Sequence, residues 1–141
     1  MENRKTVVIK TDKQFTDLNS IAKEFCEGRK GQGILNIFVR HATCGVKIIE
    51  NETLLLADIN EHLDHIAPKD GHYLHDRIEI RDVPVTERVN GFSHIRQLYF
   101  PSSINIPVEE GNIMLGKWQT IFLVELDPIR DREIVLSYIS M

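Results

Sequence analysis

The run Thr120-Ile121-Phe122-Leu123-Val124-Glu125-Leu126 is the most informative stretch for the fold, because almost all of its side chains are apolar. Side chains of a strand alternate between its two faces, and here both faces are largely apolar. A strand of this kind must be covered on both sides. We therefore expect residues 120–126 to be a central strand of a sheet, with packed layers above and below it.

Further strands and helices are expected on either side of this run. The expected strands are residues 6–10, 34–41, 44–50, 78–82, 104–108, 113–115 and 133–139. A short turn through Ala42 and Thr43 favours pairing of 34–41 with 44–50 as antiparallel neighbours. Helices are expected after an Asp17 or Asn19 cap, after an Asn51 cap, and from an Asn90 cap to Phe100. The sequence predicts a single compact α+β domain over residues 1–141, with a mostly antiparallel β-sheet core and two to three packed helices.

Composition limits the class of protein. The 141 residues carry a net charge of −4, with acidic and basic residues interspersed, so no basic stripe indicates a nucleic-acid partner. No apolar run is long enough for a signal core or a membrane span. Cys26 and Cys44 lack CxxC spacing, which favours two free buried thiols. We expect a cytoplasmic protein with no membrane or nucleic-acid partner.

Three of the six histidines lie where a site can form. His41 ends the strand 34–41 on its apolar face, His75 lies in a polar loop, and His94 shares a helix edge with Asn90. Imidazole is the commonest metal ligand near neutral pH, and three ligands with an open position are typical of catalytic zinc. Acceptors that could orient these rings are Glu50, Asp58 and Asp76. The spacing forms no short metal motif, so solvated histidines remain the alternative.

Two other features have competing interpretations. His62 and His65 lie three apart on the helix after Asn51, but the same turn must bury apolar residues, so a solvated face is favoured over a metal site. His72 is interpreted as a loop residue. Trp118 lies at the mouth of the central strand and either walls a pocket for a flat ligand or is an ordinary core or interface aromatic.

Several ordered motifs resemble those of the YjbQ family. Residues 103–121 resemble the family signature, and HATCGVKIIEN at 41–51 is similar to its block of the form HTS-A-G with a closing N-E-N. Residues 73–76 resemble its Y-x-H element, residues 90–94 its N-x-x-x-H helix start, and residues 125–130 its E-x-D-G-x-R close. The resemblance covers most of the chain. It implies an α+β fold, a homotrimer, a metal-compatible pocket near the subunit interface, and secondary thiamine-phosphate synthase activity.

The resemblance also implies roles for individual residues. A divalent metal ion, zinc or alternatively magnesium, is expected on His41, His75 and His94. The expected catalytic residues are Glu50, Asn90, Lys117, Trp118 and Gln119. Glu50 and Asn90 would orient ligands, and Lys117 or Arg96 would add positive charge for a small phosphorylated ligand. The alternatives are a metal-dependent hydrolase of a small phosphorylated substrate and a non-enzymatic trimeric metal-binding protein.

The chain departs from the family pattern at four positions. Lys117 stands where the family usually has Ser or Thr, and Ala42 replaces a usual Thr. Ile49 replaces a usual Asn, and Pro128 stands in place of the closing Gly. An ammonium group at 117 would either bind a phosphate or point to solvent, so the departures bear on the substrate rather than on the fold.

Overall fold

The apolar run forms the middle strand of a three-stranded antiparallel sheet. The computed structural model describes residues 1–141, and in it β7 (Thr120–Glu125) lies between β2 (Phe15–Asp17) and β4 (Cys44–Ile49). Ile121 and Leu123 face one buried cluster, whereas Phe122 and Val124 face another. The prediction of a central strand covered on both sides is confirmed.

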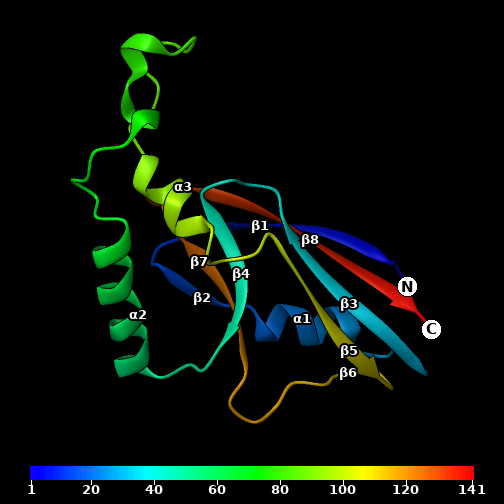
Figure 1. Ribbon diagram of the computed structural model, residues 1–141. Helices are drawn as coiled ribbons and strands as arrows, with labels where there is room; N and C mark the ends of the chain where they lie inside the picture. The colour runs from blue at the N-terminus through cyan, green and yellow to red at the C-terminus, as the bar shows by residue number, and fades with distance from the viewer.

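A second sheet of five strands lies against one face of the first sheet (Figure 1). Its order is β1 (Arg4–Lys10), β8 (Asp131–Ser140), β3 (Gln32–Val39), β5 (Ser103–Glu109) and β6 (Asn112–Ile113). Every pairing in both sheets is antiparallel. The expected strand at 113–115 is shorter than predicted, because pairing with β5 ends at Ile113.

Three α-helices complete the domain: α1 (Asn19–Cys26), α2 (Thr53–Ile66) and α3 (Gly91–Gln97). Leu63 of α2 packs in the same cluster as Phe122 and Val124, so α2 covers the face of the three-stranded sheet that points away from the other sheet. The predicted α+β class, the antiparallel sheets and the number of helices are confirmed. None of these helices combines the length and the apolar character that a membrane span requires.

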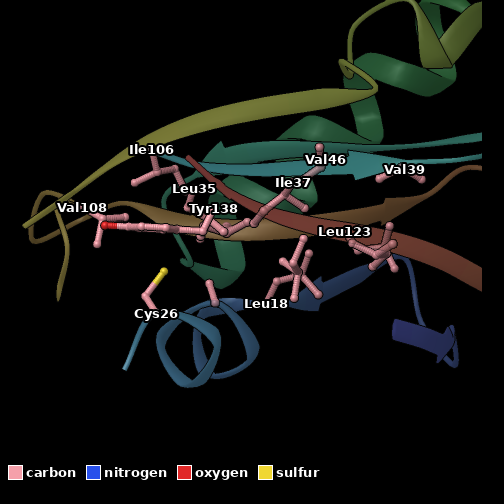
Figure 2. Close-up of a cluster of buried hydrophobic side chains, with 14 of the residues drawn as sticks. Leu18, Cys26, Leu35, Ile37, Val39, Val46, Ile106, Val108, Leu123 and Tyr138 are labelled. Carbon is pink, nitrogen blue, oxygen red and sulfur yellow. The ribbon is translucent and has the colours of Figure 1, made fainter. Parts of the chain in front are cut away.

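The main core lies between the two sheets and α1 (Figure 2). Leu35, Ile37 and Val39 alternate along β3 and are all buried, as their period of two predicts. They meet apolar side chains from β4, β7, β8 and α1. Both cysteines are free and buried in this cluster, which confirms that prediction.

The strands around Ala42 and Thr43 do not form the expected hairpin. β3 belongs to the five-stranded sheet and β4 to the three-stranded sheet, so the chain changes sheets between them. The apolar faces of both strands point into the same core, with Val39 from β3 and Val46 from β4. Facing sheets bury both apolar faces at once, which side-by-side pairing would not achieve.

The expected strand at 78–82 is also wrong. The chain forms two 3₁₀ turns there, η1 (Leu74–Asp76) and η2 (Ile78–Ile80), in an arm that projects beyond α3 (Figure 1). No strand pairs with this arm. Two apolar residues of the arm are therefore left exposed, Leu74 at 82% and Ile80 at 69%, whereas Ile78 is half-buried.

Two helices are capped by side chains other than the predicted ones. The side chain of Glu52, not Asn51, accepts hydrogen bonds from the first turn of α2. Asn90 precedes α3 but makes no capping bond with its side chain. Instead Asp76 of η1 accepts a hydrogen bond from the Gly91 amide at 2.8 Å. The arm is thereby attached to the start of α3.

Candidate functional site

A buried ion pair lies at the carboxyl end of β7. Arg132 is fully buried and Glu125 is 6% exposed. The Arg132 Nε donates to Glu125 Oε1 at 2.9 Å, and a second guanidinium nitrogen donates to Oε2. Thr11 Oγ1 donates to Glu125 at 2.6 Å, while Arg132 also donates to the carbonyl and hydroxyl oxygens of Thr43 at 3.1 and 3.0 Å. Two charges taken out of water need this degree of satisfaction to be tolerated.

Hydrogen bonding controls the ionisation of Glu125. Burial raises the pKa of this carboxyl, but the hydrogen bonds from Arg132 and Thr11 and from the Asp127 amide outweigh burial and leave the pKa lowered. Glu125 is therefore charged at neutral pH and balances the Arg132 guanidinium. One nitrogen of that guanidinium, Nη1, is buried and has no hydrogen-bond partner in the chain.

Asp127 organises a second group of polar side chains beside the first. Its Oδ2 accepts from Asn90 Nδ2 at 2.7 Å and from Arg130 at 2.8 Å, and Arg88 approaches Oδ1 to 3.7 Å. Asn90 and Asp127 are both buried. Asn90, predicted as a site residue, therefore has a fixed amide orientation whose carbonyl oxygen points away from Asp127.

Two of the predicted histidines lie side by side. The rings of His75 on η1 and His94 on α3 are 4.4 Å apart between centroids. Burial and then the charge of His75 lower the pKa of His94, so its ring favours the neutral form that binds metals. The Nδ1 atom of His75 is buried and makes no hydrogen bond. An unpartnered imidazole nitrogen beside a second imidazole is suited to bind a cation of borderline softness.

His41 lies at the same end of the sheets but is held differently. It follows β3 rather than ending it, and its Nε2 accepts a hydrogen bond from the Glu133 amide at 2.8 Å. Burial and then the nearby Arg132 lower the pKa of His41. Only its Nδ1 is left to bind a ligand. Within one chain, no three His, Cys, Asp or Glu side chains are grouped closely enough to hold a metal ion together.

The remaining predicted site residues lie at the opposite end of β4 and β7. Cys44 pairs with Glu125 at one end of these strands, and Ile49 pairs with Thr120 at the other. Glu50 follows β4 and Gln119 precedes β7, so both lie at the second end. A strand of six residues separates the two ends by about 17 Å. The two groups of predicted residues are not brought together within one chain (Figure 1).

The loop before β7 holds its aromatic side chain in the open. Trp118 is 66% exposed, and Lys117 Nζ lies 4.9 Å from its ring centroid. The side-chain oxygen of Gln119 accepts from the Gly116 amide at 2.7 Å and so fixes the loop. Trp118 is therefore not a core residue of the isolated chain, which leaves a ligand or an interface as its contact.

The other sequence-based candidates are placed as follows. Asp76 bonds to the Gly91 amide, so it acts as a helix cap and not as the expected acceptor behind a histidine. Asp58 and His62 line a groove between β4 and α2, away from the histidine pair. The ring of His62 packs edge-on against Tyr99, with centroids 5.9 Å apart, as part of an exposed helix face.

Sequence reasoning missed the buried charges that surround the histidines. The sequence points to Glu125, Asp127 and Arg130 only through the family motif at 125–130, and that motif does not include Arg132. A signal was available, because Arg132 alternates with Ile134 and Leu136 on the buried face of β8. A charge in phase with core residues indicates a buried ion pair.

Comparisons with known proteins agree with this fold. The family model described as UPF0047 protein YjbQ-like matches residues 4–141. A UPF0047 protein of Methanothermobacter thermautotrophicus is 41% identical over 105 residues, which cover 74% of this chain and 67% of that protein. One from Mycobacterium bovis is 31% identical over 91% of this chain and 93% of that protein.

Solved structures show the same architecture. A hypothetical protein of Aeropyrum pernix superposes with a TM-score of 0.84 at 29% identity and full coverage of both chains. An uncharacterised conserved protein of Clostridium acetobutylicum gives 0.80 at 30% identity, covering 95% of this chain and 98% of that one. Since the family model and the solved folds both extend over essentially the whole chain, it belongs to the YjbQ-like UPF0047 family.

Proposed function

We propose that the chain is an enzyme of the secondary thiamine-phosphate synthase type, working as a cytoplasmic homotrimer. The reaction would join a pyrimidine-methyl diphosphate to a thiazole phosphate and release diphosphate. The observation that supports this proposal most directly is the His75–His94 pair, with its buried and unpartnered Nδ1. Paired imidazoles of this kind are not needed by the core, which is already closed by apolar residues.

The donor set fits a divalent metal ion. His75 and His94 would hold it as a pair, because no third His, Cys, Asp or Glu side chain of the same chain is grouped with them. Imidazole donors favour zinc over magnesium. When bound, such an ion would neutralise negative charge that develops on the departing diphosphate. The buried Asp127 would keep Asn90 oriented toward the substrate, and Trp118 would stack on one of the two rings.

The separation of the two residue groups supports a site shared between subunits. Glu50, Lys117, Trp118 and Gln119 lie at one end of β4 and β7, and the histidines lie at the other. A contact between unlike ends of two copies is heterologous, and repetition of such a contact closes into a ring when the rotation between successive copies permits closure. A homotrimer in which the Trp118 loop of one subunit reaches the histidines of the next would complete the site.

The test begins with untagged protein. We expect near-stoichiometric divalent metal per chain by elemental analysis, a trimer by native mass spectrometry, and thiamine phosphate with diphosphate as products. His75→Ala and His94→Ala should lose both metal and product formation. His72→Ala, an exposed histidine of the same arm, is the matched control and should retain both. Unchanged metal content in both variants would show that the site assignment is wrong.

A metal-dependent hydrolase is the second candidate. The imidazole-rich donor set suits zinc-dependent hydrolysis better than it suits magnesium-dependent diphosphate chemistry, because magnesium sites are usually rich in oxygen ligands. The same assay separates the two functions. Diphosphate released only when both substrates are present indicates the synthase, whereas phosphate released from one substrate alone indicates the hydrolase. Bound metal with neither product would favour the non-enzymatic metal-binding protein.

A further inference from the structure

A second candidate site adjoins the buried charges on the side of α2 and α3. A cleft of about 890 Å³ opens there between four segments: the β1–β2 loop, the end of α2, α3, and the turn after β7. Its volume lies in the range of about 300–1,000 Å³ that is typical of small-molecule sites. None of the three predicted metal ligands lines it.

Two of the three positive charges that line this cleft are unpaired, whereas three of its four negative charges are paired with arginines. Lys13 and Lys69 line the cleft, are exposed, and pair with no carboxylate. Four carboxylates also line it. Asp64, Glu125 and Asp127 each form an ion pair with an arginine, and Asp12 does not. The two free ammonium groups therefore exceed the one free carboxylate.

The wall of the cleft contains an arginine in a fixed position. Arg96 is 4% exposed, donates from Nε to the Ala67 carbonyl at 2.9 Å, and pairs with Asp64 at 2.9 Å. Its guanidinium also lies 5.2 Å from the centroid of the Phe92 ring. These contacts use only one edge of the planar group. A guanidinium held in place in this way loses little freedom when it binds an oxyanion, for which its donors are geometrically matched.

Apolar side chains also line part of the cleft. Phe92, Leu126, Pro128 and Ile129 line it, and Ile129 is 59% exposed although it lies on the wall of a cleft. Apolar side chains beside a cluster of cations suit a ligand that has an anionic end and an organic body. From this arrangement we infer that the cleft binds an organic phosphate monoester, with its phosphate on Arg96, Lys13 and Lys69 and its ring or chain on Phe92 and Ile129. The thiazole phosphate of the proposed reaction belongs to this ligand class, but the inference uses neither the histidines nor a metal, so its failure is distinguishable from failure of the proposed function.

The experiment titrates metal-free protein, dialysed against a chelator, with phenyl phosphate and with inorganic phosphate by isothermal titration calorimetry. Phenyl phosphate should bind saturably and more tightly than inorganic phosphate. The variant Lys13→Gln/Lys69→Gln should bind phenyl phosphate about tenfold more weakly, equivalent to about 1.4 kcal/mol. Arg96→Lys keeps the charge but loses the planar donors, and it should also weaken binding.

Matched controls separate a built site from general electrostatic attraction. Lys5→Gln/Lys30→Gln removes the same charge from exposed positions outside the cleft and should leave affinity within about twofold, since screened surface charges contribute little at a distance. His94→Ala should bind phenyl phosphate as the wild type does, even where the synthase activity is lost. No saturable binding by the wild type, or an equal loss in both lysine pairs, would overturn the inference.

Discussion

The buried ion pair between Glu125 and Arg132 stabilises the end of the sheets near the histidines. Removing one partner of a buried ion pair leaves the other charge uncompensated, which costs about 3–5 kcal/mol. We expect Glu125→Gln to lower the free energy of unfolding by about 3 kcal/mol in urea titrations. Glu133→Gln, which removes an exposed pair with Arg40, is the control and should cost at most about 1 kcal/mol. Equal effects of the two substitutions would contradict the assignment of a buried pair.

The lowered pKa of Glu125 predicts a stability loss in acid. In the unfolded chain this carboxyl has an ordinary pKa near 4.5, and in the folded chain the pKa is lower. The unfolded state therefore binds more protons between these two values, so folding is progressively weakened as the pH falls below about 4.5 toward the folded pKa. The urea concentration at the unfolding midpoint, measured from pH 6 to pH 3, should decrease as the pH passes through this window. The fall should be shallower in Glu125→Gln, which has no carboxyl to protonate, and an equal slope would contradict this origin.

Cys44 is predicted to be chemically inert. Burial raises the pKa of its thiol to about 12, although the nearby Arg132 partly opposes the rise, so almost no thiolate exists at pH 8. Burial also raises the pKa of Cys26. In the folded protein neither thiol should react with a disulfide reagent on the timescale of minutes, and both should react after unfolding in guanidinium. Fast labelling of the native protein would show that this part of the core opens.

At the scale of elements, the contact between η1 and α3 positions the histidine pair. Asp76 on η1 accepts a hydrogen bond from the Gly91 amide at the start of α3. His75 lies on η1 and His94 on α3, so this bond holds the two rings together. Loss of an N-cap costs about 1 kcal/mol, and here it should also release the arm that carries His75. We expect Asp76→Ala to lower the free energy of unfolding by about 1 kcal/mol and to speed up hydrogen exchange of the α3 amides. Asp82→Ala, an exposed aspartate in the same arm, should change neither quantity.

Some elements could be predicted from sequence and others could not. Period-two alternation predicts β3, and the continuous apolar run predicts β7, because both patterns are local properties of the strand itself. The pairing of β3 with β8 and β5 instead of with β4 could not be predicted, since a short turn is compatible both with a hairpin and with a change of sheet. Residues 78–82 alternate apolar and polar side chains but have no neighbouring strand to pair with, so the pattern alone is misleading.

The whole molecule presents its two groups of candidate residues at opposite ends. If the site is shared as proposed, Trp118, the single tryptophan, lies near the histidines only in the assembled ring. Stoichiometric Cu²⁺ should then quench its emission, because quenching by this ion acts at short range. His94→Ala should remove the quenching, and so should dilution that dissociates the trimer. Copper binding without any quenching would place the Trp118 loop away from the metal and contradict a shared site.

The fold class, the central strand, the core faces and the candidate histidines can be predicted from the sequence, because they depend on local periodicity and residue chemistry. Which of these candidates lie together is visible only in the three-dimensional structure. It joined His75 to His94, placed Glu50 and Trp118 at the other end of the sheet, and buried Arg132 against Glu125. The physical reason is that these contacts join residues far apart in the chain. Their geometry follows from how two sheets and three helices bury their apolar faces together, which no local pattern encodes.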